Sequence, residues 1–408
     1  ASVETPSGVL RHGTDNRPSV AHLPFFAASF VWNYGLGMTW LAVPLYAHSQ
    51  GLSAAEIGVL FSVPVLAQVT INLVGGAYTD RVGGRSVMLA ACLAMAFGGL
   101  ELSFAQGFWP LFWGQVLMVF TRAAFWPANW AMASELPGDR SRNVGRLNAA
   151  SNLAQILGNA SCGFVLAYSG FRAGLLSIAA LGALAMLLGF ATPASAPRKP
   201  PSRGMFAGYL VLARRPIMYY GVLCAYLSAL PMTLSMTFFP LLLKEFGYGE
   251  APSGILIALR AVGGIAAGLI LARYVSTGPA SRSPIWAGLA VAASLVLMPI
   301  LPHWSALGTL MFVVGLGSGL QTLYVQIRMP DVTATDVRGS ALALVGLGWS
   351  LSHLTTPMIA GLLAERFGTG WGFHALGLLA FGFVAVIAGA RRWAFRDTAL
   401  ADRSAVRM

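Results

Sequence analysis

The sequence predicts an all-α integral membrane protein with twelve transmembrane helices, arranged as two pseudo-symmetric bundles of six. Three observations predict this class. Charged residues make up 10% of the 408 residues, against about 25% in an ordinary soluble protein. Apolar runs repeatedly exceed about 18 residues, close to the roughly 20 that a helix needs to cross a bilayer. A basic, proline-rich segment divides these runs into two sets of six.

Apolar runs of this length are expected to be helices, because backbone groups in lipid must form hydrogen bonds within their own segment. A membrane-spanning barrel would instead show short segments of alternating hydrophobicity. The expected spans are roughly 23–46, 55–78, 86–106, 109–134, 145–168, 172–191, 217–243, 252–272, 284–302, 305–328, 340–363 and 371–390.

The dividing segment is 192–216, "TPASAPRKPPSRGMFAGYLVLARRP". Prolines and bases at this density are typical of a linker on the membrane surface. The sequence thus predicts the following domains: a cytoplasmic N-terminal tail over 1–21, an N-terminal bundle over 22–191, the basic cytoplasmic linker over 192–216, a C-terminal bundle over 217–390, and a cytoplasmic tail over 391–408.

The net charge of +12 follows the predicted topology. Most of the 26 lysines and arginines lie on one side of the predicted spans, and Arg172, Lys244 and Arg366 lie on the other. By the positive-inside rule both termini are expected in the cytoplasm, which fits a multi-pass protein of a bacterial inner membrane. Since topology accounts for the bases, no nucleic-acid partner is predicted. The cysteines all fall within apolar runs, so neither a disulfide framework nor a metal cofactor is expected.

The two halves of the chain carry matching glycines. Gly163 and Gly170 flank the end of the fifth span, and Gly361 and Gly368 repeat this spacing in the eleventh. Six-helix halves in parallel repeat are a standard design of secondary transporters, with the substrate site near the midplane between them. The spacing therefore favours an internal duplication.

The loop after the second span reads "GGAYTDRVGGR", and it resembles a signature of the major facilitator superfamily, Gly-x-x-x-Asp-Arg-x-Gly-Arg-Lys/Arg. Gly76, Asp80, Arg81, Gly83 and Arg85 match this pattern. The glycine that follows Gly83 stands where the family often has arginine. Together with the number of spans, the resemblance covers roughly residues 22–390.

The resemblance implies the major facilitator fold, transport by alternating access, and a latch role for this loop in the outward-open state. The residue types also have physical reasons to be there. Asp80 can accept hydrogen bonds at a helix N-terminus, and Gly83 permits a tight reversal into the third helix. A plain topology-setting loop is the simpler alternative.

Two arginines fall within predicted spans. Arg122 lies near the middle of the fourth span in "FTRAAFWPANW", which resembles the family's fourth-helix arginine motif; in proton-coupled members that arginine handles substrate or protons. Arg260 lies in the eighth span. Charges inside a membrane are costly unless they face a cavity or a partner, so both are predicted to bind an anionic or zwitterionic substrate. The alternatives are an Arg122 that anchors backbone carbonyls, and neutralisation of either arginine by Glu101.

Glu101 and His353 are the candidates for proton coupling. Glu101 is the one carboxylate well inside a predicted span, near the outer end of the third. His353 lies in the eleventh span, and imidazole titrates near physiological pH. A water-exposed Glu101 and a purely structural His353 are the alternatives.

Met232 and Met236 lie one turn apart in "LPMTLSMTFFP", and thioethers select soft ions such as Cu(I). Copper-importing members of the superfamily have Met-x-x-x-Met at this place and His-x-x-x-Met in the next helix. Here the second element would run from Arg260 to Gly264 and offers no such ligands. Packing on an apolar face is therefore the competing interpretation.

The fifth span departs from a pattern of family antiporters, Gly-Pro-x-x-Gly-Gly. It reads Gly158-Asn-Ala-Ser-Cys-Gly163, without the proline. This weakens an assignment as a drug–proton antiporter.

Further polar and aromatic residues of the predicted spans are candidates for contact with substrate, and each could equally serve packing. They are Asn33, Tyr34, Trp126, Asn129, Tyr226 and Gln321.

The predicted function is a secondary active transporter that moves a small anionic, zwitterionic or amphipathic organic solute by alternating access, coupled to protons. A soft-metal importer and a drug or metabolite efflux antiporter are the alternatives. We expect no enzymatic activity, since the spans hold no catalytic dyad or metal motif; a non-transporting sensor would share this feature. The expected partners are the solute, protons and the lipid bilayer, and the expected state is a monomer.

Overall fold

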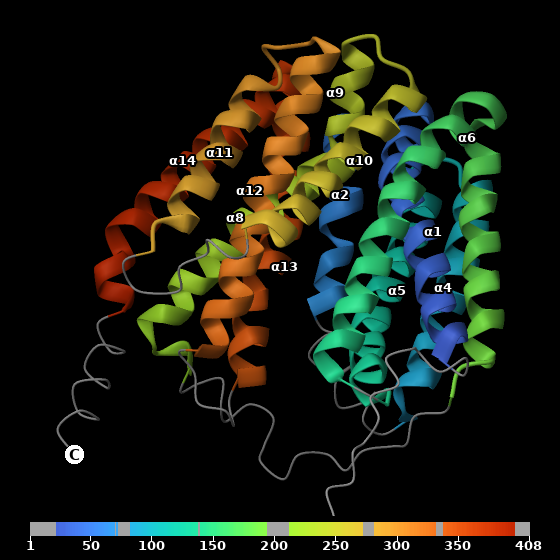
Figure 1. Cartoon of the computed structure of the whole chain (residues 1–408). Helices are drawn as coiled ribbons and strands as arrows, with labels where there is room; N and C mark the ends of the chain where they lie inside the picture. Colours follow the sequence, from blue (N-terminus) through green and yellow to red (C-terminus); the bar gives the residue numbers. More distant parts are fainter. Residues whose placement is uncertain are drawn as a thin grey trace, which may run out of the picture.

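The computed structural model describes residues 22–69, 71, 82–137, 139–193, 212–271, 281–331 and 338–395. Within these ranges the chain is helical apart from short turns, with no strand. The helices run roughly side by side and form two groups (Figure 1). One group precedes residues 194–211 in the sequence and the other follows them. The predicted fold class, an all-α protein of two helical bundles, is confirmed.

The N-terminal bundle accounts for the first six predicted spans. Its helices are α1 (Leu23–Ser49), α2 (Ala54–Ser62), α4 (Gly84–Phe104), α5 (Phe108–Glu135) and α6 (Arg140–Phe190). After α2 the chain is helical again over 64–69. The long α6 holds two spans, because Gly170 breaks the helical path with φ of 78°.

The C-terminal bundle accounts for the other six spans. Its helices are α8 (Pro216–Thr237), α9 (Phe239–Glu245), α10 (Glu250–Ala266), a π-helical turn (Ala267–Leu271), α11 (Ser283–Leu297), α12 (Trp304–Asp331), α13 (Arg338–Phe367) and α14 (Thr369–Ala394). The main difference from the predicted spans is α11, which ends five residues before 302, ahead of a proline-containing turn.

The glycine repeat seen in the sequence has a structural counterpart. Gly170 and Gly368 both adopt positive φ, 78° and 91°, in the turns that follow the fifth and eleventh spans. Side chains other than glycine are disfavoured in this region of φ. The equal spacing therefore marks equivalent turns in the two halves.

The outer surface of the bundles is apolar. Trp109, Leu187 and Leu378 are each more than 60% exposed, although exposed apolar patches of this kind are costly in water. Six described helices are long and apolar enough to cross a membrane: 84–104, 142–190, 216–237, 250–271, 304–327 and 369–394. Lipid is the environment that this surface fits.

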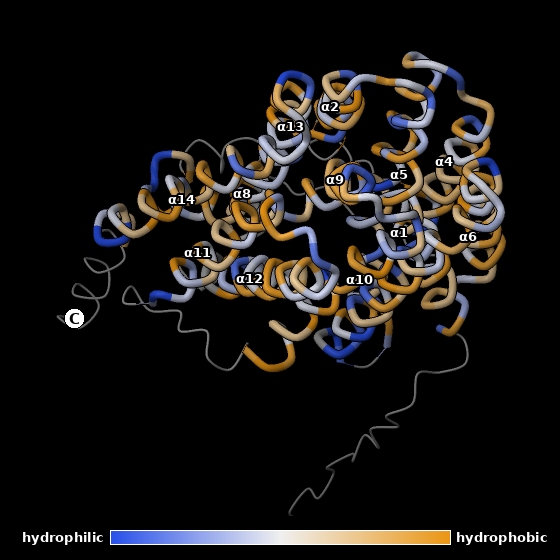
Figure 2. Tube along the Cα trace, turned by 90° about the horizontal axis from the view of Figure 1, so that it is seen from above, coloured by the Kyte–Doolittle hydropathy of each residue, from blue (hydrophilic) through white to orange (hydrophobic). Residues whose placement is uncertain are grey.

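Two helices pack against the opposite bundle. α2 lies beside α13 (Figure 2) and packs mainly there, whereas α10 packs both against α6 and against α12 of its own bundle. Glycines permit these contacts: a Cβ on Gly58 would lie 2.6 Å from the carbonyl oxygen of Pro357, and one on Gly163 would lie 2.5 Å from that of Glu250. The halves thus meet backbone against backbone, and small residues drive such helix packing in lipid.

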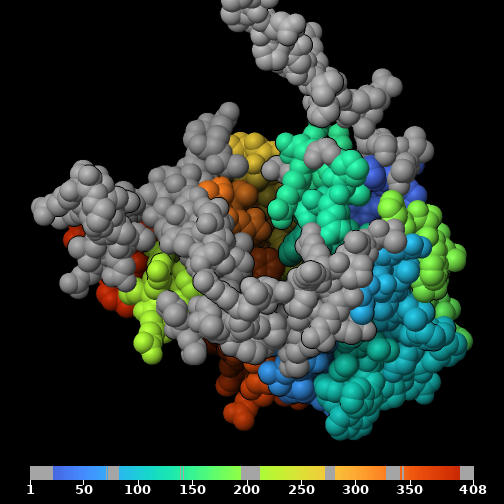
Figure 3. Space-filling model, turned by 90° about the horizontal axis from the view of Figure 1, so that it is seen from below, coloured from blue at the N-terminus to red at the C-terminus, as the bar shows by residue number. Residues whose placement is uncertain are grey.

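These contacts lie at one end of the molecule, which we call the closed end. It carries the turns at Gly51, Gly170, Gly247 and Gly368. At the opposite, open end the surface is hollowed between the region of α5 and α6 and that of α12 and α13 (Figure 3). The described part of the molecule is therefore open to one side.

The three cysteines, Cys92, Cys162 and Cys224, are buried and unpaired. They pack within helices α4, α6 and α8.

Candidate functional site

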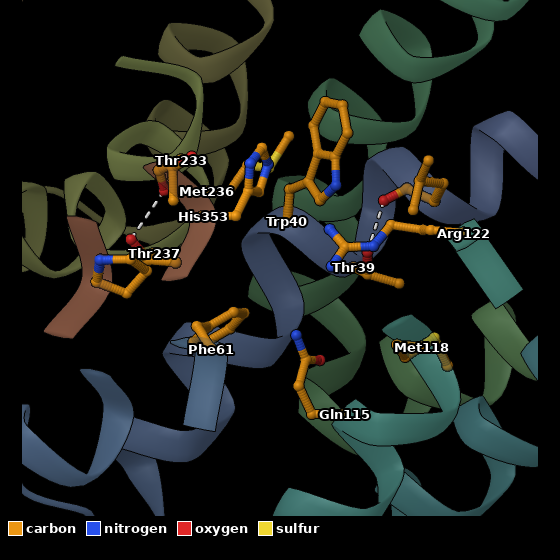
Figure 4. Close-up of a pocket in the computed structure, with 12 residues that line it drawn as sticks. Thr39, Trp40, Phe61, Gln115, Met118, Arg122, Thr233, Met236, Thr237 and His353 are labelled. Carbon is orange, nitrogen blue, oxygen red and sulfur yellow. Dashed lines mark hydrogen bonds between the residues drawn. The ribbon is translucent and has the colours of Figure 1, made fainter. Parts of the chain in front are cut away.

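A small cavity lies between the two bundles and, together with the solvent-open space at its mouth, measures about 430 Å³. Its walls come from α1, α2, α5, α8 and α13, so both halves of the chain contribute (Figure 4). The lining residues are Leu36, Thr39, Trp40, Phe61, Gln115, Met118, Arg122, Thr233, Met236, Thr237, His353 and Pro357.

Arg122 is the charged group of this lining. It shares one face of α5 with Gln115 and Met118, at helical spacings of seven and four residues. Its guanidinium points toward the middle of the residues around the cavity (Figure 4). Neither a hydrogen bond nor an ion pair joins it to another described residue, and no described acidic residue lines the cavity. A guanidinium has five N–H donors, so the cavity presents donors and positive charge without a counterion.

His353 enters the cavity from α13. Its Nδ1 lies 2.8 Å from the carbonyl oxygen of Trp349, one turn earlier, and its ring stacks on the Trp349 ring at 6.3 Å between centroids. A carbonyl oxygen can only accept a hydrogen bond, so Nδ1 carries the hydrogen and Nε2 of the neutral ring keeps a free lone pair. His353 is thus held in one tautomer and one orientation.

Arg260 lies behind the cavity wall. It is only 7% exposed, and its Nε has no hydrogen-bond partner. Its guanidinium carbon is 6.0 Å from the centre of the Trp40 ring, which does line the cavity. This is the distance range of a cation–π contact. Arg122 and Arg260 therefore belong to opposite bundles, with Trp40 between Arg260 and the empty space.

Two of the predicted polar candidates, Asn33 and Asn129, belong to contacts between α1, α5 and α6. Asn33 donates to Ser151 at 3.1 Å, and Gln155 donates to Asn33 at 2.8 Å. Asn129 donates to Ser29 at 3.1 Å on the same side of α1. Asn33 and Asn129 are fully buried. Their amides hold the N-terminal bundle together.

The other candidates also contact protein groups outside the lining. The hydroxyl of Tyr34 donates to Ser161 at 2.6 Å, and Trp126 packs edge-on against Trp32. In the C-terminal bundle, the hydroxyls of Tyr226 and Thr355 share a 2.7 Å hydrogen bond. The fully buried Gln321 donates to the carbonyl of Pro284.

Glu101 does not line the cavity. Its Oε2 is buried without a hydrogen-bond partner where α4 meets α5, against Gly114. Of the methionine pair, Met236 lines the cavity, whereas Met232 packs against the hydrophobic core. Within the described residues no group of three or more His, Cys, Asp or Glu side chains could hold a metal.

Part of the loop motif lies within the described residues. Gly83 has φ of 85° and precedes the first turn of α4, as expected of a tight reversal. Arg85 donates to the carbonyl of Phe190 at the end of α6. Gly76, Asp80 and Arg81 lie outside the described residues.

Sequence reasoning missed several lining residues. Gln115 could have been found, because it lies seven residues before Arg122 on the same helical face. Thr233 and Thr237 flank Met236 in the quoted methionine segment and share its face of α8. For Trp40 and Phe61 no pattern in the sequence distinguished a lining side chain from a packed one.

Comparison with known proteins agrees with this architecture. A family model described as "Major Facilitator Superfamily" matches residues 25–328 and 227–404. A Na(+), Li(+), K(+)/H(+) antiporter of Planococcus maritimus is 23% identical over 85% of this chain and 91% of its own. A probable nitrate/nitrite transporter, NarK2 of Mycobacterium tuberculosis, is 25% identical over 74% of this chain and 79% of its own.

Among solved structures, a bacterial homolog of the human lysosomal transporter Spinster superposes with a TM-score of 0.73 at 16% identity, covering 94% of this chain and 98% of that one. At this identity the match shows the fold. Relatives of this kind move different solutes, so they support a secondary transporter without naming its substrate. The two bundles, the cavity between them and a family model matched along almost the whole chain lead to one assignment: the protein is a member of the Major Facilitator Superfamily.

Proposed function

We propose that this protein transports small organic solutes that carry an anionic group, by alternating access, with Arg122 as the binding group for the anion. The observation that carries the proposal is that no acidic residue of the described ranges serves as a counterion for Arg122 in the cavity. A charge at this depth costs several kcal/mol or more unless it is paired or hydrated. A carboxylate or phosphate would match the donor fork of the guanidinium.

The remaining lining suits the organic part of such a solute. Gln115, Thr39 and the threonines of α8 offer hydrogen-bonding groups, and Trp40 and Phe61 offer apolar surface. Sites for small molecules typically combine mostly apolar walls with a few polar groups that fix orientation. One relative, 25% identical, is named as a transporter of the anions nitrate and nitrite, which is compatible with an anion in this cavity.

The orientation follows from the positive-inside rule. The rule places both termini in the cytoplasm, so the closed end would face outward and the hollow would face the cytoplasm. In this inward-open state Arg122 is reached from the cytoplasmic side. Rocking of the bundles would part the contacts of α2 with α13 and of α6 with α10 and open the other side. We expect this to occur in a monomer in the bacterial inner membrane.

A screen of ligands tests the proposal. The thermal stability of the purified protein is measured with acetate, lactate, succinate, benzoate, glycerol phosphate and alanine, and with tetraphenylphosphonium as a cationic control. We expect at least one anion to raise the melting temperature, and the cation to leave it unchanged. Uptake of the best anion into proteoliposomes is then measured.

The variants Arg122→Gln and Arg172→Gln form a matched pair. Arg172 stacks on Phe104 at 4.7 Å, away from the cavity. A charge-assisted hydrogen bond contributes about 1.5–3 kcal/mol, so Arg122→Gln should weaken anion binding about tenfold to a hundredfold, and Arg172→Gln should leave it unchanged. Wild-type uptake by Arg122→Gln vesicles would remove Arg122 from the mechanism.

The soft-metal alternative keeps one supporting observation, since Met118, Met236 and His353 line the same cavity. Against it, the positive charge of Arg122 in the same lining would repel a cation there. Adding Cu(I) with a reducing agent to the screen separates the two: stabilisation by Cu(I) that is lost in Met236→Leu would favour the metal.

A further inference from the structure

We infer that His353 carries a proton together with the anion on Arg122, so that one anion and one proton cross the membrane as a pair. The inference rests on the proposed function, because it needs an anion in the cavity. Arg122 and His353 line the same space from different bundles, α5 and α13. In Figure 4 the His353 imidazole lies beside Trp40, across from the Arg122 guanidinium.

The choice of His353 follows from the chemistry of the lining. Among the described lining residues, His353 is the one with an imidazole, the side chain whose charge most readily changes around physiological pH in proteins. Its Nδ1–H is engaged with the Trp349 carbonyl at 2.8 Å, so a proton can be gained and lost only at Nε2. The carboxyl of Glu101 lies where α4 meets α5, away from this space.

Most described neighbours of His353 are uncharged. The elements around it contribute Trp40 from α1, Phe61 from α2, and Thr233 and Met236 from α8, which are all uncharged. On its own helix, Thr355 is bonded to Tyr226 of α8. Within the part of the chain that the structure describes, the charged side chain that faces it is Arg122 of α5.

Coupling then follows from Coulomb's law. In the empty cavity the guanidinium of Arg122 opposes a second positive charge on His353. An anion bound to Arg122 cancels that field, and Nε2 can take a proton from the water that fills the open end. When the bundles rock, the anion and this proton are released together on the other side. For a monovalent anion, the net charge moved in each transport cycle is therefore zero.

Thermodynamic linkage makes the coupling between anion binding and protonation measurable. If the anion favours protonation of His353, then protonation must favour the anion by the same factor. The dissociation constant of the anion should therefore fall by up to about tenfold for each unit by which the pH is lowered, over the range in which the complex gains its proton. The measurement uses the anion that stabilises the protein most in the screen, between about pH 5.5 and about pH 8.5.

The test variant is His353→Asn, whose amide can still donate to the Trp349 carbonyl but cannot titrate. The matched control is His374→Asn on α14, a histidine that also packs against a tryptophan in the preceding turn, Trp371, but lies outside the cavity. We expect the pH dependence to shrink to less than about twofold in His353→Asn and to persist in His374→Asn. His353→Gln serves as a second variant if the first does not fold.

Proteoliposomes that enclose a pH-sensitive dye give the second readout. Anion uptake by the wild type should acidify the lumen and should not respond to membrane potential, whereas His353→Asn should carry the anion alone and respond to potential. Retention of proton movement by a folded His353 variant overturns the inference while leaving anion transport intact. If no anion binds in an Arg122-dependent way, the proposed function itself is wrong, and the inference is overturned with it.

Discussion

The carboxylate of Glu365, at the end of α13, accepts a hydrogen bond from the backbone amide of Ala55 at 3.3 Å. Ala55 lies in the first turn of α2, where backbone amides lack partners within the helix. Ser53 and Glu56 form a capping box within the same turn, so Glu365 adds a partner from the opposite bundle. This hydrogen bond exists only while the closed end is closed.

We predict that Glu365→Ala shifts the conformational equilibrium toward the state open at this end. An exposed hydrogen bond to a carboxylate at a helix N-terminus contributes about 1 kcal/mol, which corresponds to a change of about fivefold in the ratio of the two states. The measurement is the distance distribution between spin labels at Gln50 and Lys244, one on each half at the closed end. An unchanged distribution would contradict the assignment of Glu365 as a contact that holds the end shut.

Glu245 supplies the control for this prediction. It accepts hydrogen bonds from the backbone amide and the hydroxyl of Thr369 at the start of α14. The contact resembles that of Glu365 but stays within the C-terminal bundle. Glu245→Ala should lower thermal stability and shift the ratio of the two states less than Glu365→Ala does, since its interaction across the closed end is a screened electrostatic one with His48.

The glycine contacts of the closed end predict a second shift in the same direction. A methyl group on Gly163 would lie 2.5 Å from the carbonyl oxygen of Glu250, so Gly163→Ala must push α6 away from α10. We expect a larger population of the state open at this end and slower transport. Gly382→Ala is the control, since nothing lies within 4 Å of a Cβ there. Equal label distances in the two variants would count against the backbone contact.

Replacement of Arg260 should separate stability from binding. A buried charge without an ion-pair partner among the described residues carries a desolvation cost on the order of several kcal/mol, which an apolar residue of similar length avoids. We therefore expect Arg260→Met to raise the melting temperature of the unliganded protein. If Arg260 also helps to hold the anion through the Trp40 wall, the additional stabilisation by the anion should be smaller in the variant. A lower melting temperature without ligand would show that the cation–π contact outweighs desolvation.

The amide contacts around Asn33 predict a structural effect. Asn33→Leu removes the partners of Ser151 and Gln155, and each buried polar group left unsatisfied costs about 1–3 kcal/mol. A clear loss of thermal stability is expected. Thr309→Val is the control, because the hydroxyl of Thr309 bonds only the carbonyl of Ser305 on an exposed face of α12.

Much of the fold was predictable because its signals are strong and local. Long apolar runs gave the helices, and the spacing of Gly163 to Gly170 and of Gly361 to Gly368 indicated equivalent turns, which the positive φ values of Gly170 and Gly368 confirm. The boundaries of α11 were less predictable, since apolar residues continue into the turn that follows it.

The site was predictable only in part. A charge within a span is rare enough to single out Arg122, and the structure places this residue in the cavity lining. A polar side chain within a span can face a cavity or can bond to another protein group. The sequence does not distinguish these two cases. Asn33 and Gln321 form hydrogen bonds to other protein groups. The same ambiguity concealed Trp40, an aromatic residue in an apolar run.

The burial of all three native cysteines has a practical consequence for spectroscopy. Maleimide and methanethiosulfonate reagents react with thiolates that water can reach, and Cys92, Cys162 and Cys224 are each 0% exposed. A cysteine introduced at the surface should therefore be labelled selectively, without prior replacement of the three buried cysteines. Distance and accessibility measurements on this protein can then start from unaltered packing.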